Sequence, residues 1–283
     1  MDRLTVISVA ESYTHCAAIA RARAKNFYYS FLVLPKQKRL AMCAVYAFMR
    51  ECDDLSDEAG ATQERLVDWR EQMERALDGD MPPHPLWPAF ADTVARYRIP
   101  RAYLYDMIHG VTSDLNFTQP QSFQDLYQYC YRVAGVVGLT ITHIFGFEHT
   151  RALEMAEKCG IAFQLTNILR DIGEDAVLGR SYLPVELMQQ YDVTAEDLKQ
   201  KRVSPQLQEL LRDLGRRAHG YYEFSLPMIE LVDRDSRSSL WALIEIYSRL
   251  FRRIESSGYE VLEGRHRLPA WEKLTILAQA ALR

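Results

Sequence analysis

Residues 40–58, LAMCAVYAFMRECDDLSDE, give the clearest indication of the architecture. Pro35 stands where a first helical turn would begin, and neither glycine nor proline occurs between it and Gly60. An uninterrupted run of this length, apolar in its first half, predicts a long buried helix. Its carboxyl end is unusual, because three aspartates occur within residues 53–57 and aspartate is a poor helix former.

The same helical periodicity continues along nearly the whole chain. Apolar residues recur at helical spacing over residues 66–77, and capping boxes begin at Ser122 and Thr194. The expected helical segments are 86–97, 101–115, 122 to about 147, 151–178, 205–226, 236–256 and 270–282. Residues 82–88 and 179–204 are the clearest loops. No stretch is a convincing strand, so we predict an all-α fold, a single domain over residues 1–283 with helices around a common interior.

The composition excludes several classes of protein. Lys and Arg number 34 and Asp and Glu 38, so the formal charge is 34 − 38 = −4, which argues against a nucleic-acid surface. The five cysteines form no Cys-x-x-Cys pair, so we expect neither a zinc site nor a disulfide framework. The longest apolar stretch, residues 41–49, is far below the roughly 20 residues that span a bilayer. We expect a cytoplasmic protein, with peripheral association at the inner face of the membrane left open.

Two segments carry acidic side chains whose presence helix formation does not explain. Asp53 and Asp57 lie four positions apart, and therefore about 40° apart on one helix face. Asn167, Asp171 and Asp175 repeat this four-residue spacing. Asp171 follows Asp53 by 171 − 53 = 118 positions, and Asp175 follows Asp57 by 175 − 57 = 118, so the two pairs have the same internal spacing. Like charges at this spacing destabilise a helix by about 0.2–0.5 kcal/mol per pair, so a cation should compensate.

Magnesium is the cation that these side chains suit best. Hard divalent cations prefer oxygen ligands, and Mg²⁺ is commonly held by one or two carboxylates together with substrate phosphates. Two facing stripes would therefore bind a diphosphate through a cluster of Mg²⁺ ions. The alternative is that each stripe is a solvated helix end. A di-iron centre has little support, because the single Glu-x-x-His, Glu263 to His266, lacks a matched partner.

The acidic segments belong to longer motifs. These are YAFMR at 46–50 with DDLSD at 53–57, YCYRVAGVVG at 129–138, QLTNILRDIGED at 164–175, GRSYLP at 179–184, Tyr247, GY at 258–259, RHRLP at 265–269 and Lys273. From about Tyr13 to Lys273 the chain thereby resembles the squalene/phytoene synthase family, the head-to-head branch of the all-trans isoprenyl diphosphate synthases. One departure is RAKNF at 23–27, where members commonly carry serine-rich residues before the phenylalanine.

The resemblance implies an isoprenoid-synthase-type bundle around a central apolar cavity. It also implies a Mg²⁺-dependent reaction that joins two prenyl diphosphates at their first carbons, through a cyclopropylcarbinyl diphosphate, with release of diphosphate. The expected metal ligands, several of them catalytic, are Asp53, Asp57, Asn167, Asp171 and Asp175, with Glu174 as support. The residues expected to contact diphosphate oxygens are Lys25, Arg50, Arg170 and Arg265. For Arg50 and Arg170, an ion pair with a neighbouring aspartate is an equal alternative.

The carbocation formed in such a reaction must be kept from water, which aromatic faces and apolar walls can do. We expect Tyr46, Tyr129 and Tyr247 at the reacting end, with the Tyr129 hydroxyl engaging diphosphate or relaying a proton. The residues expected to bind the prenyl chain are Val133, Gly135, Val137, Gln164 and Leu165. Small residues in VAGVVG should let a flat hydrocarbon approach the backbone. For each aliphatic residue, ordinary helix packing is the alternative.

The resemblance leaves several functions open. The first is condensation of two farnesyl diphosphates to presqualene diphosphate or a squalene-type product, with NADPH as a further cofactor if a reductive step follows. The alternative is formation of phytoene from two geranylgeranyl diphosphates. Chain elongation or terpene cyclisation fits YCYRVAGVVG and GRSYLP less well, and the complete acidic stripes disfavour an inactive assembly factor. No motif indicates the substrate length or the oligomeric state.

Overall fold

The structure is a computed structural model that describes residues 7–24, 27–57, 62–115 and 117–283, with the backbone alone at Asp57. Its helices are α1 (Val9–Arg23), α2 (Phe27–Phe31), α3 (Lys36–Asp57), α4 (Gln63–Leu77), α5 (Trp87–Arg96), α6 (Arg101–Leu115), α7 (Phe123–Cys130), the π-helix η1 (Tyr131–Gly135), α8 (Val136–Phe145), α9 (Arg151–Val177), α10 (Val185–Gln190), α11 (Ala195–Lys199), α12 (Pro205–Ser225), α13 (Met228–Leu231), α14 (Arg234–Ser256) and α15 (Ala270–Ala281). No strand forms within these residues, although an isolated antiparallel bridge joins Phe147 and Val232. The predicted all-α fold is confirmed.

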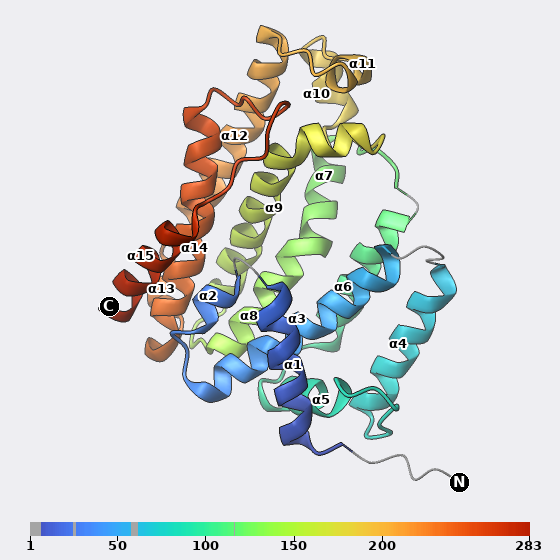
Figure 1. Ribbon diagram of the computed structural model, residues 1–283, viewed down its shortest axis with the longest axis vertical. Coiled ribbons are helices and arrows are strands. Elements are labelled where there is room, and N and C mark those ends of the chain that lie inside the picture. Colours follow the sequence, from blue (N-terminus) through green and yellow to red (C-terminus); the bar gives the residue numbers. More distant parts are fainter. Residues whose placement is uncertain (1–6, 25–26, 58–61, 116) are drawn as a thin grey trace.

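Helix α9 is the centre of the bundle. It packs against α8, η1, α12 and α14, whereas α3 packs against α1, α5, α6 and α8. Figure 1 shows α9 in the middle, with α12 and α14 on one side and α3 and α6 on the other. The two helices that carry the acidic stripes, α3 and α9, therefore both contact α8. The buried apolar side chains form one continuous cluster, which supports the expectation of a single domain; the domain assignment stays a prediction.

Most helix boundaries agree with the sequence within two residues, and both capping boxes form, at Ser122 and at Thr194. Three expectations were incomplete. Residues 179–204 are not simply a loop, because they contain α10 and α11, and α5 begins inside the expected loop 82–88. The apolar run after Ser122 is interrupted by η1. This interruption was not predicted, because a π-helical turn has no hydrophobic period of its own.

Helix η1, helix α8 and helix α9 meet so closely that only glycine fits at two positions. A Cβ at Gly160 would lie 2.3 Å from the carbonyl oxygen of Ala134, and a Cβ at Gly138 would lie 2.5 Å from that of Ala156. The small residues of VAGVVG thus allow a neighbouring helix to approach the backbone, and the expected approach of a hydrocarbon stays a prediction. This close approach sets the distance between two walls of the site described below.

Candidate active site

Two adjoining hollows lie between α3, α8, α9 and α14. The outer chamber, with about 1010 Å³ of empty space including its mouth, is lined by Phe31, Met42, Val45, Tyr46, Arg50, Asp53, Arg170 and Arg265 among others. The inner chamber, with about 760 Å³, is lined by Val133, Gly138, Phe145, Ala156, Gly160, Phe163, Met228 and Leu240 among others. Six residues line both: Phe27, Met49, Val137, Ile141, Asn167 and Tyr247. The chambers therefore share one junction, as two substrates that react with each other would require.

Each chamber runs from a polar end toward an apolar floor. The outer chamber follows α3 from Asp53 to Met42, and the inner chamber follows α9 from Asn167 to Ala156. Both stretches cover 53 − 42 = 11 and 167 − 156 = 11 positions, or about 16 Å of helix. Two chambers of equal depth suit two chains of equal length.

The polar end of the outer chamber carries arginines from four segments. Arg50 forms an ion pair with Asp54, which also accepts from Arg23 at 3.0 Å. The ion-pair alternative for Arg50 is therefore confirmed, with Asp54 as the partner. Asp54 was not selected from the sequence, although it is i+4 from Arg50. The Nε atom of Arg50 is buried without a hydrogen-bond partner, and Arg50 lines the chamber, so a donor is available for a phosphate oxygen.

The second acidic stripe is held by arginines. Arg170 donates from Nε to Oδ1 of Asp171 at 2.7 Å, and Arg265 donates from Nη2 to Oδ2 of the same carboxylate at 3.0 Å. Arg265 also contacts Glu174 at 3.4 Å. The expected groups are thus brought together, with the ion-pair alternative realised for Arg170. Burial, with the charges of Asp171 and Glu174, raises the pKa of Asp175 to about 6.

The residue types at this end fit Mg²⁺. The amide of Asn167 donates to Oε1 of Gln164 at 3.3 Å, which leaves the buried Oδ1 of Asn167 without a partner at the chamber junction. Asp53 lines the outer chamber, and burial, followed by the charges of Asp171 and Glu174, raises the pKa of Asp175, so a nearby cation would stabilise its ionised form. Among the described residues, no three acidic, His or Cys side chains already form a metal cage.

Two of the three selected tyrosines lie at the chamber junction or beside it. Tyr247 lines both chambers and stacks on Phe163, with ring centroids 4.2 Å apart, and burial raises its pKa to about 12. Tyr46 lines the outer chamber, and burial also raises its pKa. Both rings therefore present aromatic surface where a carbocation would form.

Tyr129 lies in a different hollow. It stacks on Tyr182 with centroids 4.9 Å apart, and both hydroxyls donate to Asp114, at 3.4 and 3.3 Å. Burial, chiefly, and the charge of Asp114 raise the pKa of Tyr182 to about 12. Neither Asp114 nor Tyr182 was selected from the sequence, although Tyr182 belongs to GRSYLP. The proposed proton role of Tyr129 stays a prediction.

The expected prenyl wall is partly corrected. Val133, Val137 and Gln164 line the inner chamber, whereas Gly135 and Leu165 are not among the lining residues. Gly135 packs beneath Tyr131 and against α9, and Leu165 is buried about 100° further round α9 than Gln164, in the helix-packing core. Of the remaining selected residues, Lys25 lies outside the described residues, as does the side chain of Asp57.

Comparisons with known proteins agree with this geometry. The sequence profile of the squalene/phytoene synthase family matches residues 20–272. The chain belongs to the squalene/phytoene synthase family. It is 36% identical to a 15-cis-phytoene synthase from Synechococcus elongatus, covering 98% of this chain and 94% of that protein. It is 34% identical to a phytoene synthase from Mycobacterium bovis, covering 96% and 91% of the two chains.

Solved structures of this family have the same fold. A dehydrosqualene synthase in complex with a ligand matches with a TM-score of 0.89 and 33% identity, over 96% of each chain. A squalene synthase from Alicyclobacillus acidocaldarius matches with a TM-score of 0.84 and 25% identity, over 89% of this chain and 95% of that one. As a squalene/phytoene synthase, the protein is a prenyltransferase that condenses two prenyl diphosphates head to head, in a family that generally depends on divalent metal.

Proposed function

We propose that this squalene/phytoene synthase joins two molecules of geranylgeranyl diphosphate to form phytoene. Farnesyl diphosphate was the first expectation from the sequence, but the similar phytoene synthases from Synechococcus and Mycobacterium favour the alternative. These relatives cover nearly the whole chain, the segments that form both chambers included.

Chamber depth does not separate the two substrates, and the choice rests on the similar phytoene synthases. Each bond of an extended chain advances about 1.2 Å, so a geranylgeranyl main chain spans about 18 Å and a farnesyl main chain about 13 Å. Each chamber has about 16 Å of helix between its polar end and its last lining residue on that helix. Because this depth is counted from Asp53 and Asn167, which would hold the metal and the diphosphate, it must also take the headgroup, so a farnesyl chain fits it extended and a geranylgeranyl chain fits it with a bent end.

The chain's own residues supply binding, orientation and exclusion of water. Asp53, Asn167, Asp171 and Asp175 would hold Mg²⁺, whose chemistry is to neutralise charge on the departing diphosphate. Arg50 and Arg265 donate to diphosphate oxygens at the outer mouth, Arg50 through its unpartnered Nε. Tyr46, Tyr247 and Phe163 surround the junction, so the first carbons meet in an aromatic, dry environment.

The second candidate is condensation of two farnesyl diphosphates, which the similarity to the dehydrosqualene and squalene synthase structures favours. Incubation of the purified protein with each prenyl diphosphate separates the two candidates. We expect geranylgeranyl diphosphate with Mg²⁺ to give phytoene without NADPH, and excess chelator to stop it. Faster turnover of farnesyl diphosphate would contradict the proposal, and a product that forms only with NADPH would indicate a reductive second step.

We also propose that the enzyme associates peripherally with the inner face of the membrane through α15. No helix of the described residues is long and apolar enough to span a bilayer. On α15 the exposed residues Trp271, Leu274, Ala278 and Leu282 recur at spacings of three and four and form an outward apolar stripe, with Trp271 66% and Leu282 90% exposed. This helix packs against α2, whose residues Phe27 and Phe31 wall the outer chamber.

Charge complementarity favours an anionic lipid surface as the partner of this stripe. Residues 265–283 contain four basic side chains, Arg265, Arg267, Lys273 and Arg283, against the single acidic Glu272, which pairs with Arg253. Binding to phosphatidylglycerol vesicles should fall at least about tenfold in Leu274→Glu and persist in Val67→Glu, a matched change at an exposed valine of α4. Equal binding by both variants, or lipid-independent dimers that Leu274→Glu dissolves, would contradict the proposal.

A further inference from the structure

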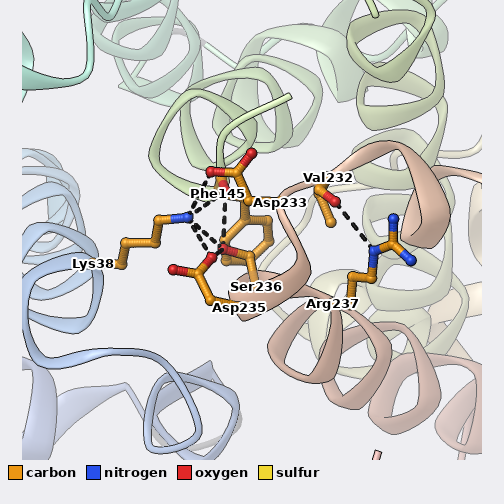
Figure 2. A network of polar contacts seen from close by, with 7 residues as sticks. All are labelled: Lys38, Phe145, Val232, Asp233, Asp235, Ser236 and Arg237. Carbon is orange, nitrogen blue, oxygen red and sulfur yellow. Dashed lines mark hydrogen bonds and ion pairs between the residues drawn. The ribbon is translucent and has the colours of Figure 1, made fainter. Parts of the chain in front are cut away.

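Beneath the two chambers, a single lysine connects three helices. Lys38, in the first turn of α3, donates from Nζ to the carbonyl oxygen of Phe145 at 2.7 Å, to Asp233 at 3.0 Å, to Asp235 at 2.6 Å and to Ser236 at 3.0 Å. Figure 2 shows these contacts between the end of α8 and the start of α14. The side chain of Lys38 is only 13% exposed, whereas Asp233 and Asp235 are about half exposed, so the network separates the chambers from solvent.

The contacts suit the chemistry of each group. The carbonyl of Phe145 ends α8, where carbonyls lack intrahelical partners and a cation is favourable. Ser236 donates to the same oxygen at 2.9 Å. The adjoining turn is equally restricted: Asp233 donates its backbone N–H to the Gly146 carbonyl at 3.0 Å, and a Cβ at Gly146 would lie 2.1 Å from Oδ2 of Asp233.

Side chains next to this network close the chambers. The ring of Phe145 lines the inner chamber, together with Leu240, which lies one turn beyond Ser236 on α14. Met42, one turn beyond Lys38 on α3, lines the outer chamber. Counted along α3, Lys38 lies 53 − 38 = 15 positions from Asp53, or about 22 Å, and therefore one turn beyond Met42, the last residue of α3 that lines the outer chamber.

We propose that Lys38 is a positioning residue that fixes the floor of both chambers and thereby limits the length of the prenyl chain that the enzyme accepts. It ties the start of α3, and with it Met42, to the corner where α8 meets α14, which Ser236 and the backbone of Asp233 join directly. Without its ammonium group, α3 can move away from this corner, and the floor that Met42 and Phe145 form recedes. This inference rests on the prenyl condensation of the proposed function, but it does not depend on which chain length the wild type prefers.

The test compares Lys38→Met with Lys36→Met, a matched change at an exposed position of the same helix. For each protein, kcat/KM is measured with the preferred prenyl diphosphate and with the diphosphate one isoprene unit longer. One methylene in an apolar pocket changes selectivity by about 10-fold or more, so Lys38→Met should raise the ratio of longer to preferred substrate at least about tenfold. Lys36→Met should leave the ratio unchanged, and Lys38→Arg should largely restore it, because arginine keeps the positive charge.

Asp235→Asn and Ser236→Ala keep the test decisive if Lys38→Met does not fold. Each removes one partner of Lys38, so each should raise the same ratio by a smaller factor. An unchanged ratio in the folded variants, or an equal change in Lys36→Met, would overturn the proposal. If the wild type turns out to prefer farnesyl diphosphate, the proposed substrate is wrong, yet the rise in the ratio on loss of Lys38 is still expected.

Discussion

Replacing Gly160 by alanine places a methyl group against the backbone of η1. The added Cβ would lie 2.3 Å from the Ala134 carbonyl oxygen, 2.7 Å from its carbonyl carbon and 2.9 Å from the Gly135 Cα. Because ordinary carbon contacts lie near about 3.5–4.0 Å and all three of these atoms belong to the backbone, the two helices must separate by about 1 Å. Overpacking costs about 1–3 kcal/mol, and a clash with three backbone atoms should lie at about 2–3 kcal/mol, so after an offset of about 1 kcal/mol from improved helix propensity the net loss should be about 1–2 kcal/mol.

Gly220→Ala is the matched control, because Gly220 lies in α12 with nothing within 4 Å of an added Cβ. That variant should gain about 0.5–1 kcal/mol. At about 2 °C per kcal/mol for a chain of this size, Tm should fall by about 2–4 °C in Gly160→Ala and rise by about 1–2 °C in Gly220→Ala. Calorimetry measures both values, and prenyl turnover should fall in Gly160→Ala alone, since Gly160 lines the inner chamber. Equal Tm values in the two variants would refute the close-packing argument.

Three further predictions concern the polar groups. Asp53→Asn and Asp175→Asn should each lower Mg²⁺-dependent turnover at least about 100-fold with little change in Tm, and steady-state rates near wild type would remove both residues from the metal site. Tyr129→Phe should lower condensation at least about 100-fold while binding of a non-ionisable thio-diphosphate analogue is retained; an unchanged rate would leave Tyr129 only its packing on Tyr182. Burial and the charge of His15 lower the pKa of His84 from 6.5, so the unfolded chain binds protons more readily and stability falls as pH drops from 7 to 5. Urea unfolding should show a smaller fall in His84→Gln, and an equal or larger fall would contradict this.

The sequence predicted features that depend on local periodicity. The run without glycine or proline after Pro35 correctly predicted α3. The capping boxes at Ser122 and Thr194 correctly predicted where two helices begin, because capping depends on residues only three positions apart. The box of Ser8 with Glu11 at the start of α1 carried the same signal and was missed. The interruption at η1 had no such signal, because an extra residue in one turn changes the phase of a helix without changing its composition.

Contacts between distant helices were harder to predict. Asp54 pairs with Arg23 across 31 positions as well as with Arg50, and Asp114 meets Tyr129 and Tyr182, pairings that depend on how helices cross. Leu165 and Gln164 are adjacent in sequence but lie about 100° apart on α9, so one packs in the core and the other lines a chamber. The rotation of α9 about its own axis depends on the contact between Gly160 and Ala134. No pattern of hydrophobicity in the sequence reveals that contact.

The position of the new carbon–carbon bond tests the central claim most directly. Purified protein would be incubated with Mg²⁺ and geranylgeranyl diphosphate labelled with ¹³C at the first carbon, and the product examined by carbon and proton NMR. Head-to-head condensation across the shared junction joins the two labelled carbons, which are equivalent in phytoene, so we predict one enriched olefinic carbon signal whose attached protons show, in the proton spectrum, the second-order pattern of a ¹³CH=¹³CH unit. Labels that are separated along the chain, as in head-to-tail elongation, or a product that contains a single labelled carbon, as in cyclisation, would contradict the account.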